Sequence, residues 1–277
     1  MSDDAPAGSG RGPAPDATIV LVRHGESTWI AEGRFQGAAD PPLSTLGRRQ
    51  AALVAARLAD SSTVFVSPFP AGPPLGCWHS PLQRAAATAA AIAERWDPPL
   101  ALRPDGRLRE IGQGAWEGRT AADIARNDGA ALAGWRRDPV HVHAPGGESL
   151  SEVQGRATGF LDDLWGALAV RAAAGPPGTG TMPGGGAMPG GAAAVPFSTG
   201  ERPPWAIIVA HEGLLRVLLL ALLDLPLEAF WRFPFGLCGV SVVELRGGRA
   251  ALRAHNLVDH LAPLAARGEM PATTPGL

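Results

Sequence analysis

Two histidines stand where the sequence could place catalytic groups. Thr18 to Val22 is a short apolar run with β-branched residues, and it leads directly into Arg23-His24-Gly25. Ala206 to Ala210 is a similar run that leads into His211-Glu212-Gly213. Such runs are typical of buried parallel strands, and ligands bind at the carboxyl ends of the strands in open α/β sheets. We therefore expect His24 and His211 to share one rim of a sheet.

The residue types at this rim suit the chemistry of phosphate esters. A neutral imidazole nitrogen can attack phosphorus and hold the phosphoryl group as a phosphoramidate. A guanidinium group such as that of Arg23 can bind two phosphoryl oxygens at once. The formal net charge of the chain is only -2, so no broad basic surface is expected. Any preference for an anion must come from a local cluster of arginines.

Short strands alternate with helices along the chain. This alternation predicts a three-layer α/β/α sandwich around a mostly parallel central sheet. Ser149 and Glu152 form a capping-box pattern, and Ser80-Pro81 has the pattern of an N-cap followed by the first helical residue. The expected helices are Thr45 to Ala59, Ser80 to about Trp96, Glu148 to Arg171, and His211 to about Leu223. Further strands are expected at Val64 to Val66, and a closing hairpin at Val240 to Leu245 and Ala250 to Ala254.

Composition divides the chain into one domain, two tails and a loop. Residues 1–16 are rich in Gly, Pro, Ala and Asp and lack an apolar core segment, so we expect a disordered tail rather than a signal peptide. Residues 172–204 are nearly all small or Pro residues, which predicts a low-complexity disordered loop inside a domain at 17–265. Residues 266–277 are expected to form a C-terminal tail.

Several classes of function find no support in the sequence. Only two cysteines are present, too few for a disulfide framework or a Cys-based metal site. His141 and His143 have the spacing of a ligand pair but no suitable third ligand nearby. The apolar stretch Leu214 to Leu225 is broken by charges and is too short to span a membrane. We expect no metal, no cofactor, no nucleic-acid or membrane partner, and a cytoplasmic location.

The chain resembles the histidine phosphatase superfamily, the group that contains the phosphoglycerate-mutase-like enzymes. The resemblance extends along most of the chain, and the motifs occur in the family's order. These motifs are LVRHGEST at 21–28, GRFQG at 33–37, DPPLS at 40–44, SPLQRA at 80–85, LRE at 108–110, GAWEG at 114–118, PGGES at 145–149 and VAHEG at 209–213.

The resemblance implies a role for each matched residue. His24 would be the nucleophile, and Arg23 and Arg84 would clamp the phosphoryl oxygens. His211 would donate a hydrogen bond to a phosphoryl oxygen, and Glu110 would be the general acid, with Glu117 as the next candidate. Gln36 and Gly37 are expected at the edge of the substrate pocket.

Two departures from the family pattern affect this site. Ile30 stands where the family usually has an Asn that contributes to the phosphate pocket, and Thr28 is the residue that could replace the missing hydrogen bond. Residues 69–79 form an apparent insertion between Ser67-Pro68, where a strand is expected to end, and Ser80-Pro81. The insertion puts the position of Arg84 in question.

The implied function is a phosphatase that hydrolyses a small phosphomonoester through a phosphohistidine on His24. One alternative is phosphoryl transfer of the phosphoglycerate mutase type, with the same residues. The short segment from Glu110 to Glu148 shows no basic, Pro-rich lid of the kind that mutases carry. A second alternative is a non-catalytic phosphate-binding module. The expected partner is a small phosphorylated metabolite, and the resemblance makes a homodimer plausible.

Overall fold

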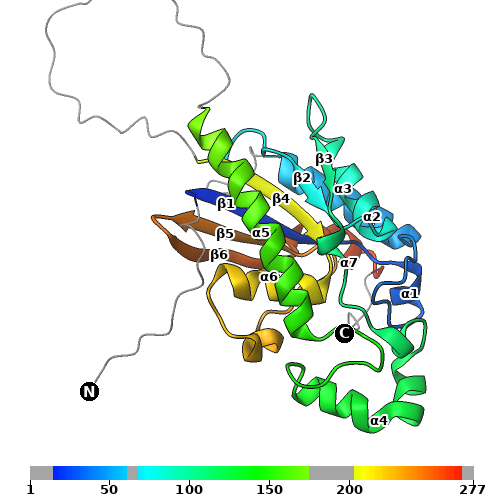
Figure 1. Cartoon of the computed structure of the whole chain (residues 1–277). Coiled ribbons are helices and arrows are strands. Elements are labelled where there is room, and N and C mark those ends of the chain that lie inside the picture. The colour runs from blue at the N-terminus through cyan, green and yellow to red at the C-terminus, as the bar shows by residue number, and fades with distance from the viewer. Residues whose placement is uncertain (1–14, 61–67, 175–202, 270–277) are drawn as a thin grey trace, which may run out of the picture.

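A six-stranded mixed sheet forms the centre of the molecule (Figure 1). The computed structural model describes residues 15–60, 68–174 and 203–269. Within these residues the strand order is β3-β2-β4-β1-β5-β6. Strands β1, β2, β3 and β4 are mutually parallel, whereas β5 runs antiparallel to both β1 and β6. The strands are β1 Ala17–Arg23, β2 Cys77–His79, β3 Leu102–Pro104, β4 Trp205–Ala210, β5 Val240–Arg246 and β6 Arg249–Leu257.

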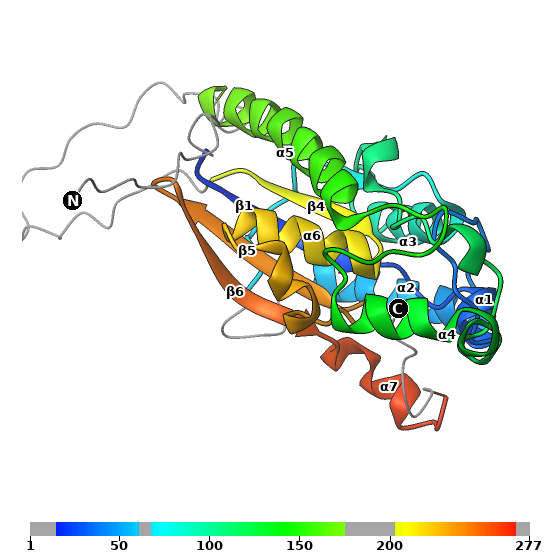
Figure 2. The same cartoon turned by 60° about the horizontal axis from the view of Figure 1, so that its bottom comes forward.

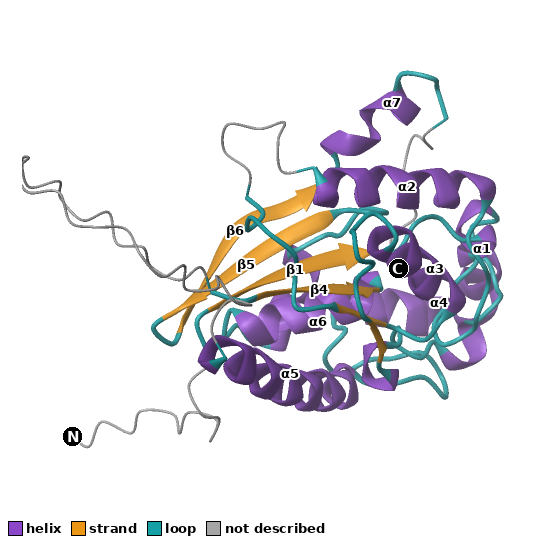
Figure 3. Cartoon of the chain, turned by 90° about the horizontal axis from the view of Figure 1, so that it is seen from above, coloured by secondary structure: helices purple, strands orange, loops and turns teal. Residues whose placement is uncertain are grey.

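Helices cover both faces of this sheet, which confirms the three-layer α/β architecture. Figure 3 shows α2 and α3 on one side of the sheet and α5 and α6 on the other, while α4 lies beyond one end of the sheet, as Figure 2 also shows. The helices are α1 Thr28–Ala31, α2 Thr45–Ala59, α3 Gln83–Ala93, α4 Ala121–Arg137, α5 Leu150–Ala173, α6 Glu212–Leu222 and α7 Ala262–Ala265.

The unbroken apolar runs of β1 and β4 follow from this layering. Side chains alternate between the two faces of a strand. Ile19 and Leu21 of β1 therefore join the core beneath α5 and α6, whereas Val20 and Val22 join the core beneath α2 and α3. Both faces are covered, which accounts for the unbroken apolar runs at residues 19–22 and 206–210. The same two strands deliver His24 and His211 at their carboxyl ends.

Local signals set several helix boundaries as the sequence predicts. The capping box of Ser149 and Glu152 is formed at the start of α5, which runs from Leu150 to Ala173 rather than from 148 to 171. Helix α2 has the predicted bounds, with Ser44 Oγ accepting the Gly47 amide at 2.9 Å. The predicted closing hairpin is β5 and β6.

The start of α3 differs from the prediction. Ser80 Oγ accepts the amide of Leu82 at 3.3 Å and makes a tight turn, so Ser80 is not the helix N-cap. The helix begins at Gln83 with Leu82 at the cap position and ends at Ala93, before Trp96. The predicted N-cap was wrong because the serine side chain bonds a residue that lies before the helix.

The place of the predicted insertion also needs correction. Strand β2 occupies Cys77–His79 and leads directly into Ser80. The extra residues therefore precede the strand and do not separate it from the motif that contains Arg84. The predicted strand at 64–66 lies outside the described residues, as do most of the two predicted tails and of the predicted loop at 172–204.

Candidate active site

His24 lies at the carboxyl end of β1 and is buried. Its backbone is fixed on both sides, because its amide donates to Ala210 O at 3.0 Å and its carbonyl accepts the Cys238 amide at 3.3 Å. Its ring Nδ1 donates to Gly25 O at 2.6 Å. Arg84 Nε donates to the other ring nitrogen, Nε2, at 3.3 Å. These bonds favour the tautomer with the proton on Nδ1 and a lone pair on Nε2.

The surroundings of His24 keep its ring neutral. Burial, together with the positive charges of Arg84 and Arg23, holds the pKa of His24 well below its usual range. Burial disfavours the charged form, and nearby cations repel an added proton. His24 Nε2 therefore carries a lone pair rather than a proton at neutral pH, as a nucleophile requires.

His211 faces His24 across the rim. It follows β4 and occupies the N-cap position of α6, and its ring centroid lies 5.0 Å from that of His24. Burial lowers its pKa first, followed by the charge of Arg84 and the proximity of His24. Both ring nitrogens are buried without a hydrogen-bond partner among the described residues. A buried polar atom of this kind needs a partner, and an anionic ligand would supply one.

Arg23 reaches the same rim from β1. Its Nη1 donates to Phe235 O at 2.6 Å and pairs with Glu212 Oε2 at 2.6 Å. Its Nε is buried and has no partner within the described chain. The backbone carbonyl and the carboxylate thus fix one end of the guanidinium and leave another donor unused.

Arg84 comes from α3 and is fully buried beside His24. Its Nη1 donates to Ala39 O at 2.7 Å, and its Nη2 donates to Gly37 O at 2.9 Å. Burial lowers the pKa of Arg84 to about 10, so the side chain stays charged at neutral pH. The structure therefore brings Arg84 to the histidines, and Gly37 helps to orient it through a backbone carbonyl.

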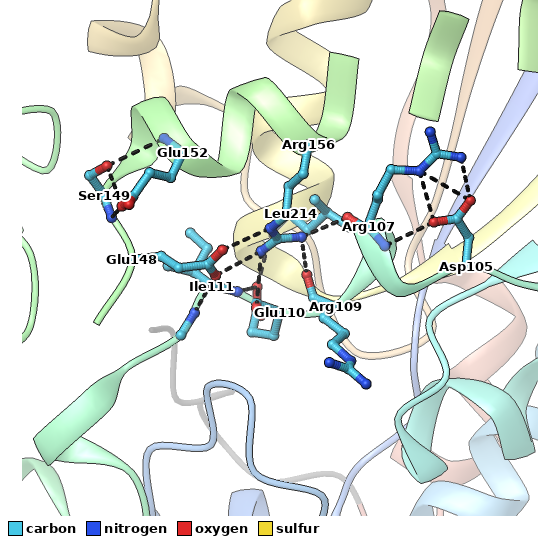
Figure 4. Close-up of polar contacts among 11 residues, drawn as sticks. Asp105, Arg107, Arg109, Glu110, Ile111, Glu148, Ser149, Glu152, Arg156 and Leu214 are labelled. Atoms are coloured by element: carbon cyan, nitrogen blue, oxygen red, sulfur yellow. Dashed lines mark hydrogen bonds and ion pairs between the residues drawn. The ribbon is translucent and has the colours of Figure 1, made fainter. Parts of the chain in front are cut away.

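The Glu110 carboxyl group binds backbone amides in the first turn of α6 (Figure 4). Its Oε1 accepts the amides of Ile111 at 2.9 Å and Leu214 at 3.1 Å, and its Oε2 accepts the amide of Gly213 at 3.3 Å. Burial raises the pKa of Glu110 against the opposing effects of these amides and of Arg84. A carboxyl group with a raised pKa can hold a proton and deliver it.

The remaining sequence candidates lie at the periphery of this cluster. Gln36 Oε1 accepts a short hydrogen bond from Ser27 Oγ. The Thr28 amide donates to Pro42 O at 3.0 Å, and within the described residues its hydroxyl makes no hydrogen bond to the cluster. Glu117 Oε1 accepts the amides of Ala38 at 2.9 Å and Gln113 at 3.0 Å. Ile30 is buried, and its amide bonds Ser27 Oγ at the start of α1.

Three charged residues that contact the site, or are linked to it by an ion pair, were not singled out in the sequence. Glu212 pairs with Arg23 and also with Arg216 one helical turn later, so the i, i+4 spacing was the available signal. Arg156 of α5 binds Glu148 and the backbone near Glu110. Nothing in its surrounding sequence distinguishes it from a solvated helix residue.

Other residues considered in the sequence have structural contacts. Trp116 and Trp135 are buried in a separate apolar cluster. His141 pairs with Asp138 at 2.9 Å, and His143 Nδ1 bonds Ala144 O at 3.0 Å. Across residues 15–60, 68–174 and 203–269, none of the helices is both long and apolar enough to cross a membrane.

The chain is similar to known proteins of a single family. The profile of the histidine phosphatase superfamily (branch 1) matches residues 19–170 and 196–258. Glucosyl-3-phosphoglycerate phosphatase of Mycolicibacterium vanbaalenii is 33% identical, covering 83% of this chain and 84% of its own. Phosphoserine phosphatase 1 of Hydrogenobacter thermophilus is 27% identical, covering 88% and 93%. A probable phosphoglycerate mutase of Cronobacter sakazakii is 30% identical, covering 82% and 84%.

A solved structure shares the same fold. The mycobacterial glucosyl-3-phosphoglycerate phosphatase in complex with inorganic phosphate superposes with a TM-score of 0.66 at 28% identity. The match covers 88% of this chain and 98% of that one.

Proposed function

Since the chain belongs to the histidine phosphatase superfamily (branch 1) and is a phosphatase, we propose that it acts through a phosphohistidine formed on His24. The observation that carries this proposal is the state of His24. Its Nδ1 donates to Gly25 O, its Nε2 accepts from Arg84, and its pKa is held low by burial and by two arginines. The ring thus presents a neutral nucleophile directly beside an anion-binding guanidinium.

In the first step, His24 Nε2 attacks phosphorus and the bond from phosphorus to the ester oxygen breaks. The leaving oxygen takes the proton of Glu110, which becomes a carboxylate. Arg23, Arg84 and His211 stabilise the charge on the phosphoryl oxygens. Support comes from the unpartnered buried nitrogens of Arg23 and His211 and from the raised pKa of Glu110.

In the second step, water attacks the phosphohistidine. The Glu110 carboxylate takes a proton from the water as its oxygen bonds to phosphorus, and the bond from phosphorus to Nε2 breaks. Inorganic phosphate leaves, His24 is again neutral, and Glu110 is again protonated. One buried carboxyl group thus serves as acid and then as base.

The proposed substrate is a small phosphomonoester metabolite, and the proposed setting is the cytoplasm with a homodimer as the assembly. Relatives named as phosphatases of phosphoserine and of glucosyl-3-phosphoglycerate support the substrate class. The net charge near zero argues against nucleic acid as a partner. A panel of phosphorylated amino acids, sugars and glycerates, assayed for phosphate release with purified protein, would identify the substrate.

A mutase reaction is the second candidate, because a relative named as a probable phosphoglycerate mutase is 30% identical. That reaction would use the same histidine and return the phosphoryl group to the product. The two activities differ in their products, so release of inorganic phosphate supports hydrolysis, and isomerisation without release supports the mutase.

Trapping the covalent intermediate tests the proposal directly. Rapid quenching with ³²P-labelled substrate should leave label on the wild-type protein that is stable to alkali and labile to acid, as a phosphoramidate is. His24→Ala should retain the fold and carry no label. Label on a serine, aspartate or cysteine would contradict the mechanism.

The acid role of Glu110 has a signature in the leaving group. An alkyl phosphate expels a strongly basic alkoxide, so Glu110→Gln should slow phosphoenzyme formation by about 10²–10⁴-fold. A nitrophenyl phosphate expels a weak base, so the same substitution should slow phosphoenzyme formation from it much less. Single-turnover measurements are needed because Glu110 also serves the second step. Equal losses for both substrates would show that Glu110 is not the proton donor.

A further inference from the structure

Arg156 uses all its side-chain nitrogens on one small part of the molecule. It lies near the start of α5, and its side chain is 17% exposed. Its Nε and Nη2 bind the two oxygens of Glu148 at 2.9 and 3.0 Å. Its Nη1 donates to Arg107 O at 2.6 Å and Arg109 O at 2.7 Å, and its Nη2 donates to Glu110 O at 3.1 Å. Figure 4 shows the guanidinium at the centre of these contacts.

All three carbonyl groups belong to the segment that carries Glu110. Glu148 holds the next part of this segment, because its Oε2 also accepts the Gly112 amide at 2.8 Å. Arg156 and Glu148 therefore bind the backbone from residue 107 to residue 112. This segment is irregular apart from one short 3-10 turn at its start, so side-chain contacts replace the ladder of bonds that a helix or strand would provide.

We propose that Arg156 is a positioning residue for the Glu110 carboxyl group. The inference rests on the proposed role of Glu110 as the general acid. The Glu110 side chain is bound to amides of α6, whereas its backbone carbonyl is bound to Arg156 of α5. Loss of Arg156 would leave three carbonyls without their partner and let the backbone of Glu110 shift. A displacement of about 1 Å can cost about 10²-fold in rate.

Arg107 provides a matched control. It also joins this segment to α5, through Gly159 O at 3.0 Å and Asp163 at 2.7 Å, and it binds Asp105. Its side chain, however, makes no hydrogen bond to the carbonyls of residues 107–110 in the described structure. A change at Arg107 should thus remove one link between segment and helix without releasing the backbone of Glu110.

A second route from Arg156 to the site has to be separated from the first. The pKa of His211 is lowered mainly by burial, then by Arg84, His24 and Arg23, with a last contribution from Arg156. If a substitution of Arg156 slows the reaction through His211, the loss of rate should persist in a Glu110→Gln variant, which can no longer give a proton. An effect through Glu110 would disappear in that background.

The test is a double-substitution cycle on single-turnover phosphoenzyme formation in the full-length protein. The variants are Arg156→Lys, Glu110→Gln, the pair combined, and Arg107→Lys as control. Lysine keeps the charge but lacks the planar fork that binds three carbonyls and a carboxylate. Each protein is assayed with an alkyl phosphate and with a nitrophenyl phosphate. Glu148→Gln is a milder second variant, because it removes one of the two acceptor oxygens and leaves Arg156 in place.

We expect Arg156→Lys to slow the alkyl phosphate reaction by about 10–100-fold and the nitrophenyl reaction by less than about 3-fold. In the Glu110→Gln background, Arg156→Lys should cost less than about 2-fold. Glu148→Gln should give the same substrate preference with a smaller loss, and Arg107→Lys should leave the ratio of the two rates unchanged.

Equal losses for the two substrates, or the same loss with and without Glu110, would overturn the positioning role. If Glu110→Gln is selective for the alkyl phosphate and Arg156→Lys is not, only this inference fails. If Glu110→Gln is itself unselective, the acid role in the proposed function fails, and this inference fails with it.

Discussion

Glu212 connects Arg23 of the candidate active site to a second buried arginine, Arg216. Its two oxygens pair with Arg23 and Arg216, and the side chains of all three residues are at most 6% exposed. Arg216 in turn lies over the rings of Trp231 and Phe230, at 4.8 and 5.2 Å from their centroids. The orientation of Arg23 thus depends on Glu212, whose second oxygen is paired with Arg216.

Neutralising Glu212 should destabilise the protein strongly. Glu212→Gln leaves two buried guanidinium groups without a counter-charge, and breaking a buried ion pair costs about 3–5 kcal/mol. Urea unfolding at neutral pH measures this difference in unfolding free energy. Glu32→Gln is the matched control, because its pair with Arg34 is exposed and should contribute less than about 1 kcal/mol. Similar losses of unfolding free energy for both variants would show that the buried ion pairs of Glu212 contribute no more than an exposed pair.

At the scale of elements, the first turn of α2 packs against the backbone that follows His24. The Ser44 amide donates to Glu26 O at 2.9 Å, and the Glu26 amide donates to Gln50 Oε1 at 2.8 Å. A Cβ atom on Gly47 would lie 1.9 Å from Glu26 O, and one on Gly25 would lie 2.5 Å from Gly47 O. Only glycine at these positions permits the helix to approach the loop so closely.

Gly47→Ala should therefore reduce the unfolding free energy by about 1–3 kcal/mol or more, because backbone must move to accept the methyl group. Gly155→Ala in α5 meets nothing within 4 Å and should stabilise the protein by about 0.5–1 kcal/mol through helix propensity. Thermal and urea unfolding of both variants measure the contrast. A neutral Gly47→Ala substitution would mean that the contact is looser than the structure indicates.

Helices and strands with a strong local sequence signal could be predicted from the sequence, whereas those with a weak signal could not. The apolar runs of β1 and β4 revealed the rim that carries His24 and His211. Strand β3 was missed because its three residues are exposed and, among the described strands, it pairs with β2 alone. Helix α4 was missed because Asp128 and Gly129 in its middle are poor helix formers, and the backbone departs from helical geometry at Asp128. The contacts of Arg156 join segments that are distant in sequence, so no local sequence pattern predicts them.

At the scale of the whole molecule, two buried neutral histidines tie stability to pH. Burial and neighbouring arginines hold the pKa values of His24 and His211 well below their usual range in the folded state. In the unfolded chain both would titrate near pH 6.5. The unfolded state therefore binds more protons below that pH, and stability is lost as the pH falls.

We expect the unfolding free energy to fall between about pH 6.5 and pH 5, with each histidine contributing up to about 1.4 kcal/mol per pH unit. His211→Asn should reduce that slope by up to this amount. Urea unfolding over a pH series gives the slopes. Equal slopes for wild type and His211→Asn would refute the linkage.

Helix α5 ends at Ala173 near the point where β4 begins at Trp205 (Figure 1), and His24 and His211 follow the opposite, carboxyl ends of β1 and β4. Strand β4 alone separates Trp205 from His211 by about 20 Å, at roughly 3.3 Å per residue. A fluorescent domain or a tether to a solid support, fused between Ala173 and Trp205, would therefore begin at the end of the sheet away from His24 and His211. This junction offers an attachment point for watching or immobilising the enzyme while it turns over.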